Sequence, residues 1–234
     1  MATTTWSLVG PLGAMTGSAN NGLPRKAGRD NFITFHPTLL NTFWVGSPAG
    51  GLWQTTNNGS TWTILNSTLA HIGCTDLVVD PTNTQIMYIA TGDGYAQDTP
   101  SFGVYKSTNG GATWAATTLT FNLVTNAVIR KLIINPTNPL ILLAAASNGV
   151  WRTTNGGTSW TQINTINTYD LDFKPGDANT VYASGTSFYL STNGGVSFSV
   201  ISSGISTTGS VRKNLAVTAA NPNYVYVVSA LSSN

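Results

Sequence analysis

The sequence predicts an all-β fold, a β-propeller of four-stranded antiparallel blades, from a repeated polar block and the strand-like runs between its copies. The block Ser/Thr-Thr-Asn-x-Gly-x-Ser/Thr-aromatic occurs at residues 55–62, 107–114, 153–160 and 191–198, at intervals of 52, 46 and 38 residues. Recurrence at such a period indicates an array of similar units. Between the copies lie short runs rich in Val, Ile, Tyr and Phe, bounded by Pro, Asn and Gly, and no window has a helical period.

Each unit holds four strand-like runs. Two of them flank a turn that usually contains Pro, as in FITFHP and TFWVGS, or LIINPTNP and LILLAAAS. A third run, such as GVYKST or GVWRTT, leads into the block, and a fourth begins at its aromatic residue. Four short antiparallel strands make a propeller blade. We expect one propeller domain, 1–234, with blades at about residues 30–66, 76–120, 128–164 and 168–202.

The two ends of the sequence leave two alternatives for ring closure. The stretch NLAVTAANPNYVYVVSA predicts the first two strands of a partial fifth blade, at residues 212–230, and no fifth block follows it. Residues 4–9 resemble the fourth-strand runs and could close the ring, which would give a defective fifth blade. Alternatively, the chain is a fragment of a larger propeller. An unclosed ring would expose blade edges and apolar faces, so we expect self-association in that case.

The block itself predicts a tight turn between the third and fourth strands. Asn-Gly or Gly-Gly supplies positive φ angles, and the Asn side chain and the hydroxyls can bond to the turn backbone. The aromatic residue brings apolar surface to pack between neighbouring sheets. We assign this structural role to Asn57, Gly59, Trp62, Asn109, Gly111, Trp114, Asn155, Gly157, Trp160, Asn193, Gly195 and Phe198.

These blocks resemble the Asp-box, or bacterial neuraminidase repeat, with the pattern Ser/Thr-x-Asp-x-Gly-x-Thr/Ser-Trp. That repeat occurs in sialidases, sortilin-type domains, xyloglucan-hydrolysing glycosidases and photosystem assembly factors. The stretches WSLVGP, AGRDNFITFHP and SPAGGLWQTTNNGSTW most resemble the sortilin-like or glycosyl-hydrolase-like propellers of secreted bacterial surface proteins. The chain departs from the pattern by carrying Asn in place of Asp. Asn keeps the acceptor oxygen and loses the charge, which preserves a turn and disfavours a cation site.

The catalytic residues that the resemblance implies do not match this sequence. Xyloglucan-cleaving enzymes use two carboxylates, one of them in a first-blade stretch like Arg-Thr-Asp-x-Gly-Gly. The matching stretch here, residues 46–51, reads GSPAGG, with Pro48 where that Asp would fall. Sialidases use three arginines with a Tyr/Glu pair, whereas this chain has five arginines and no glutamate. We therefore expect no catalytic residues and lean against an enzyme.

Composition excludes several other classes of function. Only 8% of the residues are charged, the net charge is +2, and the basic residues are scattered, so nucleic acid is not the expected partner. A single cysteine, Cys74, and two histidines, His36 and His71, predict a buried thiol, no metal site and no cofactor. No apolar run approaches the roughly 20 residues that span a bilayer, so we expect no membrane insertion. The opening stretch MATTTWSLVGPLG lacks the pattern of a signal peptide.

The irregular segments are the candidates for a ligand site. The longest insertion, residues 91–103, carries Asp93, Tyr95 and Asp98, which could bind a sugar or a calcium ion. The favoured alternative is a solvated loop whose Asp residues cap turns. The polar stretch 17–30, with its short basic patch, is expected to be a solvated loop.

These observations together predict a non-catalytic binding or scaffold module of a secreted or cell-surface bacterial protein. Its loops would recognise a glycan or a protein on one face of a rigid disc. The alternative is a fragment of a xyloglucanase-like or sialidase-like glycoside hydrolase with carboxylates partly outside this chain. An assembly factor of the thylakoid type shares only the repeat.

Overall fold

The computed structural model describes residues 29–65, 73–96, 99–124, 126–205 and 210–231, and these residues form strands, turns and loops without a helix. The first sheet contains β1 (Phe32–Phe35), β2 (Phe43–Ser47), β3 (Gly51–Thr55) and β4 (Thr63–Ile64). The second contains β5 (Cys74–Val79), β6 (Met87–Thr91), β7 (Val104–Ser107) and β8 (Ala115–Ala116). The third contains β9 (Ile129–Ile134), β10 (Leu142–Ala146), β11 (Gly149–Thr153) and β12 (Thr161–Gln162).

The fourth sheet contains β13 (Asp170–Lys174), β14 (Asp177–Ser184), β15 (Phe188–Ser191) and β16 (Ser199–Ile201). The fifth has two described strands, β17 (Ser210–Val217) and β18 (Val225–Leu231). Within every sheet the strands follow chain order and pair antiparallel. The predicted fold class is therefore confirmed: the protein is an all-β propeller with four complete blades and a partial fifth. The described chain holds no helix of the length and apolarity that a membrane crossing requires.

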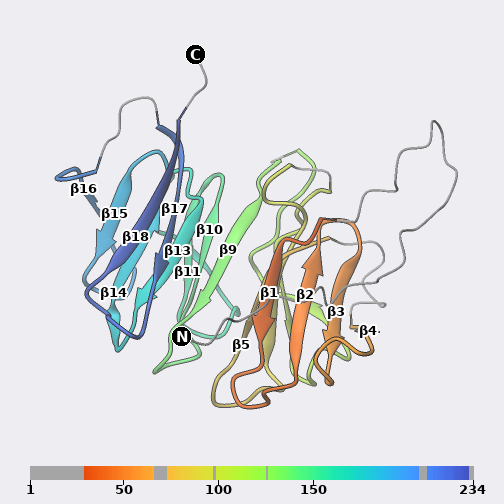
Figure 1. Cartoon of the computed structure of the whole chain (residues 1–234). Coiled ribbons are helices and arrows are strands. Elements are labelled where there is room, and N and C mark those ends of the chain that lie inside the picture. The colour runs from red at the N-terminus through yellow and green to blue at the C-terminus, as the bar shows by residue number, and fades with distance from the viewer. Residues whose placement is uncertain (1–28, 66–72, 97–98, 125, 206–209, 232–234) are drawn as a thin grey trace, which may run out of the picture.

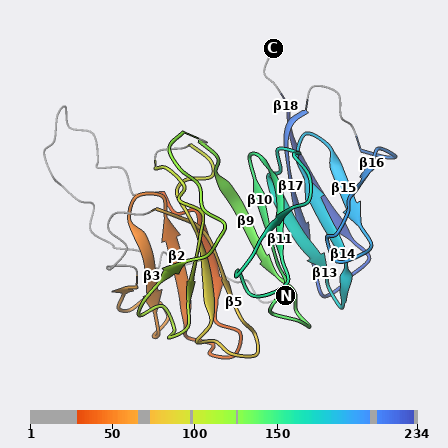
Figure 2. The ribbon, with the colours of Figure 1, turned by 180° about the vertical axis from the view of Figure 1, so that it is seen from behind.

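The sheets stand side by side, and each packs its face against the next (Figures 1 and 2). The extensive contacts between described strands of different sheets all join sheets that are consecutive in the chain, and most involve the first strands β1, β5, β9, β13 and β17. Successive side chains along these strands point to opposite faces of the sheet. Both faces of an inner blade carry apolar side chains because a neighbouring blade covers each of them.

The hydrophobic core is divided into three clusters, one between each of the first three pairs of neighbouring blades. Trp44 and Leu52 of the first sheet meet Leu77 and Met87 of the second. Large side chains of the second and third sheets, among them Tyr88, form the next cluster. A third cluster joins the third and fourth sheets around Leu143, Val150 and Leu171. Each blade is thus stabilised by its neighbours rather than by a core of its own.

The two ends of the array expose apolar side chains. On β1, Ile33 is 59% and Phe35 69% exposed; on β18, Tyr226 is 57% and Val228 74% exposed. The predicted closing strand at residues 4–9 lies outside the described residues, as does the stretch 17–28 of the expected basic loop.

Candidate functional site

The four polar blocks form the same hydrogen-bonded turn. In the first, Thr55 Oγ1 donates to Asn57 Oδ1 (3.0 Å) and accepts the Gly59 N–H (2.8 Å), while Asn57 Oδ1 also accepts the Thr61 N–H (2.8 Å). Corresponding bonds occur around Asn109, Asn155 and Asn193. Gly59, Gly111, Gly157 and Gly195 have φ angles of 80° to 90°, a region that favours glycine.

The amide of the block asparagine makes a further bond that a carboxylate could not donate. Asn155 Nδ2 donates to Ser159 Oγ at 2.9 Å, and the other three asparagines bond in the same way to the hydroxyl four residues on. Each Asn side chain therefore serves as both acceptor and donor within its own turn. These hydrogen bonds of the Asn side chain all lie within the block, so the side chain makes the turn between the third and fourth strands rigid.

The aromatic residues of the later blocks pack toward the preceding blade. Trp114 donates its indole N–H to the Leu65 carbonyl (3.2 Å), and Trp160 and Phe198 pack on the clusters between their blade and the one before. Trp62, in the first blade, is 40% exposed and meets Phe43 of its own sheet. The position of the later three at contacts between blades explains why a large apolar side chain ends those blocks.

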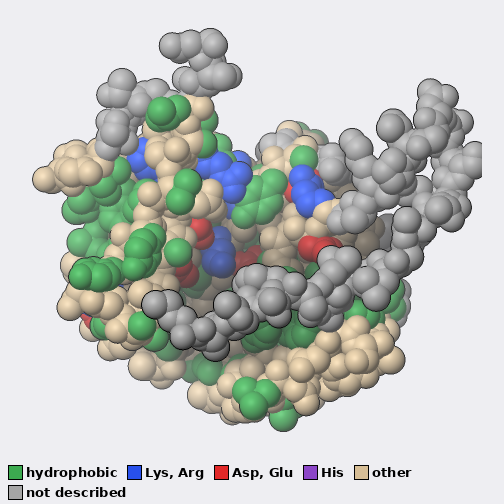
Figure 3. Space-filling model, viewed as in Figure 1, with side chains coloured by type: hydrophobic (Ala, Val, Ile, Leu, Met, Phe, Trp, Pro, Cys, Tyr) green, Lys and Arg blue, Asp and Glu red, His purple; other side chains and the backbone are tan. Residues whose placement is uncertain are grey.

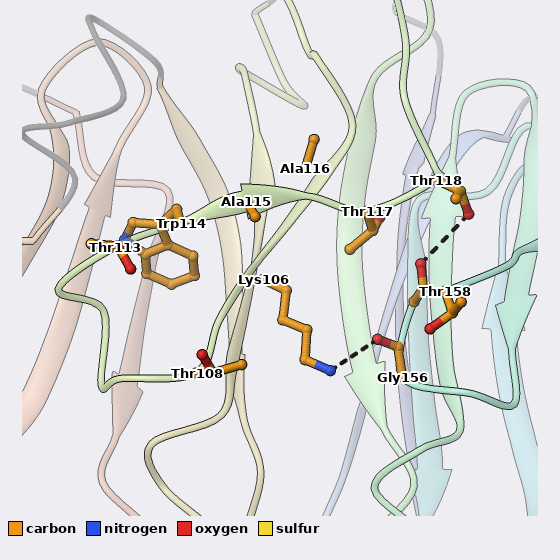
Figure 4. Close-up of a pocket in the computed structure, with 11 residues that line it drawn as sticks. Lys106, Thr108, Thr113, Trp114, Ala115, Ala116, Thr117, Thr118, Gly156 and Thr158 are labelled. Carbon is orange, nitrogen blue, oxygen red and sulfur yellow. Dashed lines mark hydrogen bonds between the residues drawn. The ribbon is translucent and has the colours of Figure 1, made fainter.

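A groove of about 370 Å³ lies on the rim between the second and third blades (Figure 4). Lys106 of β7 reaches across it and donates to the Gly156 carbonyl of the next block (3.3 Å), with Trp114 and Thr118 on its walls. Arg152 of β11 makes the corresponding bond to Gly194 (3.0 Å) one blade further on. Because the contact repeats with the blades, we interpret this groove as a seam between blades.

The inner strands carry a cluster of charged residues in a hollow of about 420 Å³. Asp76 on β5 accepts the Leu132 N–H (2.7 Å) of β9 and lies 3.9 Å from Lys131 Nζ. Asp172 on β13 lines the same hollow. Burial raises the pKa of Asp172 to about 6, against the opposing effect of Lys131. Asp76 raises the pKa of Lys131, and burial raises the pKa of Asp76 itself.

The insertion after β6 is held by its first acid. Asp93 is fully buried, accepts the backbone N–H groups of Tyr95 (3.0 Å) and Ala96 (3.2 Å), and forms an ion pair with Arg29. These bonds fix the turn that carries Tyr95, whose side chain is 40% exposed. Asp98 lies outside the described residues. The ligand-binding role of Asp93, Tyr95 and Asp98 stays a prediction, with Tyr95 the member that reaches solvent.

Tyr95 belongs to a stack of alternating rings and guanidinium groups that sequence reasoning did not find. Arg212 of β17 lies over Tyr95 at 4.5 Å and over Tyr169 at 5.3 Å, and Arg130 of β9 lies over the Tyr169 ring at 4.1 Å. Four consecutive blades thus contribute one member each to what we call the Tyr–Arg stack: Tyr95, Arg212, Tyr169 and Arg130. Basic and acidic side chains gather on the hollowed face seen in Figure 3.

Neutral hydrogen bonds orient the two arginines of the stack. Arg130 donates to the carbonyls of Gly94 (3.0 Å) and Thr168 (3.0 Å) and to Asn167 Oδ1 (2.7 Å), which ties it to the Tyr95 loop. Gly94 is required there, since a Cβ would lie 2.9 Å from the Ile129 carbonyl oxygen. Arg212 donates Nε–H to Asn214 Oδ1 (2.7 Å).

Two further expectations concern reactive side chains. Cys74 is buried, as predicted, and burial raises the pKa of its thiol to about 12. Within the described part of the chain, no three His, Cys, Asp or Glu side chains are grouped so that they could hold a metal ion. Pro48, at the position of the first-blade carboxylate in the resembling enzymes, lies in the β2–β3 turn, where its carbonyl accepts the Thr99 hydroxyl (2.5 Å).

Comparison with known proteins identifies the fold. No family model and no curated protein sequence matches the chain. Among solved structures, an ancestral GH74 enzyme matches with a TM-score of 0.64 and 23% identity, over 86% of this chain and 30% of its own. The GH74 xyloglucanase from Xanthomonas campestris matches with a TM-score of 0.63 and 17% identity, and the match covers 80% of this chain and 32% of the xyloglucanase. YCF48 bound to a D1 peptide matches with a TM-score of 0.59 and 15% identity, and the match covers 97% of this chain and 67% of YCF48.

These likenesses show the β-propeller fold. The chain spans about a third of the length of the two GH74 enzymes, 30% and 32%. Their identity to this chain is too low to transfer residues. The site is therefore assigned from its own geometry.

Proposed function

We propose that the protein is a non-catalytic recognition module, in which the Tyr–Arg stack on one propeller face binds a glycan or a protein. The observation that carries the proposal is the convergence of Tyr95, Tyr169 and Arg212 from three blades at one place, where the Tyr95 ring is exposed and the other two side chains are half-buried. Aromatic rings and guanidinium groups are enriched at binding sites because they offer large contact area with directed polar groups. A rigid array of blades holds them in place without a ligand.

We further propose that the blocks are an Asn variant of the Asp-box and that the parent protein is secreted or displayed on a bacterial cell surface. The shared turn in four copies supports the first statement. The second is supported by the resemblance to secreted propellers and by solubility that depends on Thr, Ser, Asn and Gly rather than on charge.

A glycoside hydrolase is the second candidate, favoured by the structural likeness to GH74 enzymes. Asp172 is the residue that such an enzyme could use as an acid, because burial raises its pKa to about 6. Pro48 argues against this candidate, since it stands where the resembling enzymes carry their first-blade carboxylate.

Glycan and peptide arrays test the proposal. We expect at least one ligand whose signal falls at least tenfold in Tyr95→Ala and Tyr169→Ala and is unchanged in Tyr226→Ala, an exposed tyrosine on β18 that serves as the matched control. Array signals that are unchanged in both Tyr95→Ala and Tyr169→Ala, or the absence of any signal, would contradict the proposal. Release of reducing sugar from xyloglucan that Asp172→Asn abolishes would favour the enzyme instead.

A further inference from the structure

The geometry points to an acidic glycan, a saccharide bearing uronate groups, as the ligand of the Tyr–Arg stack, with Arg212 binding its carboxylate. This inference rests on the proposed function and adds the chemical class of the ligand. Its basis is the balance of charge around the stack and the shape of the groups that carry the charge.

Three carboxylates near this face already have partners within the protein. Asp93 pairs with Arg29, and Asp76 lies beside Lys131. Asp170 accepts the Leu215 N–H (3.1 Å) and the Asn214 amide (3.3 Å). Within the described residues, neither arginine of the stack has a carboxylate within ion-pair distance.

Arg212 keeps hydrogen-bonding capacity that no described group uses. Its Nε–H bonds to Asn214, and its two terminal nitrogens have no hydrogen-bond partner among the described residues. A guanidinium has five N–H donors in a planar fork that matches a carboxylate. The rings of Tyr95 and Tyr169 hold the plane of that fork, so little rotamer entropy is lost when an anion binds.

The positive charges at the stack also repel one another. Arg130 is buried, and all its hydrogen-bond acceptors are neutral. Burial is the main cause that lowers the pKa of Arg130, and the nearby positive charge of Arg212 lowers it further. An anion bound at Arg212 would relieve this repulsion, which a neutral ligand could not do.

A saccharide fits the remaining features better than a peptide does. Tyr95 offers a partly exposed ring beside the guanidinium, and a sugar ring can pack on an aromatic face while its carboxylate reaches the fork. Strand addition and helix docking need a free strand edge or an apolar groove, and an acidic peptide held by the arginine alone is the competing ligand in the titration below.

Isothermal titration with oligogalacturonate, a neutral cello-oligosaccharide of the same length and an acidic peptide tests the inference. The variants are Arg212→Gln, Arg212→Lys and, as a control, Arg152→Gln, which removes a rim charge outside the stack. Each variant is first checked for an unchanged melting temperature. We expect oligogalacturonate to bind more tightly than the neutral sugar. Arg212→Gln should lose about ten- to hundredfold in affinity, Arg212→Lys less, and Arg152→Gln none.

Three outcomes would overturn the inference. Equal affinity for the neutral sugar, sensitive to Tyr95→Ala, would leave the recognition function intact and remove the acidic ligand. Binding of the acidic peptide alone, lost in Arg212→Gln, would assign the site to protein. Absence of binding to all three probes and to the arrays would remove both proposals.

Discussion

Asn155 illustrates how one side chain can hold a whole turn. It accepts from Thr153 Oγ1 and the Ser159 N–H and donates to Ser159 Oγ, all within 3.0 Å. We expect Asn155→Ala to lower the free energy of unfolding by about 1–2 kcal/mol. Asn155→Asp should cost less, because the Ser159 hydroxyl can reverse and donate to the carboxylate. Urea denaturation measures both, with Thr154→Ala, an exposed neighbour in the same turn, as the control. Equal stability of Asn155→Ala and Thr154→Ala would contradict the role given to the amide.

Asp172 gives the protein a predicted pH dependence. Because its pKa in the folded state, about 6, lies above the ordinary value of 3.8, the folded protein binds this proton more tightly than the unfolded chain does. Its contribution to stability is therefore present below pH 4 and is lost as the pH rises through 6. Relative to Asp172→Asn, the wild type should lose roughly 1–3 kcal/mol between pH 4 and 7. Parallel pH profiles for the two proteins would refute this assignment.

The sequence identified some members of the candidate site and missed others, for a physical reason. Tyr95 stands out because it lies in the longest insertion. Arg130, Tyr169 and Arg212 lie in or beside ordinary inner strands, where a charged or aromatic residue predicts nothing by itself. These three side chains meet only when the blades pack together, and no local sequence pattern predicts the angle between neighbouring blades. Their shared place at the start of each inner strand was the available signal.

Elements of neighbouring blades are joined by side chains that reach across to backbone groups. Asp170 of β13 accepts the N–H of Leu215 in β17, and Asp76 of β5 accepts that of Leu132 in β9. Asp170→Ala would leave a buried N–H unsatisfied at the contact with the two-stranded fifth sheet. We expect faster hydrogen exchange in β17 and β18 and unchanged exchange in β5 and β6. Asp177→Ala, at the first residue of β14, is the control. Exchange in β17 and β18 that is the same in Asp170→Ala as in the wild type would contradict this coupling.

Strand order could be predicted from sequence, and strand length could not. The runs that begin at each aromatic residue suggest full fourth strands, yet β4, β8 and β12 contain two residues each. The preceding turn uses residues up to the aromatic, and the outermost strand has a neighbour on one side only, so little of it pairs. Short outer strands also limit edge-to-edge pairing between molecules.

The whole molecule has two unequal ends, and we predict that they drive self-association. Exposed Ile33 and Phe35 on β1, and Tyr226 and Val228 on β18, leave apolar surface uncovered in the described chain. Sedimentation velocity on the 234-residue protein should show a mass that rises with concentration. The double variant Tyr226→Lys/Val228→Lys should shift the equilibrium toward monomer. Leu40→Lys, which changes an exposed leucine in the β1–β2 turn, should not. A concentration-independent monomer would contradict this prediction.

On the scale of the whole molecule, we propose that the propeller recognises a ligand on the face where four blades bring the Tyr–Arg stack together. Hydrogen exchange measured with and without oligogalacturonate tests this proposal, because it locates the protected residues. We expect protection in the loop after β6, in the residues before β13 and in the first half of β17, with the four block turns unchanged. Protection confined to the rim groove, or no protection anywhere at saturating ligand, would contradict it.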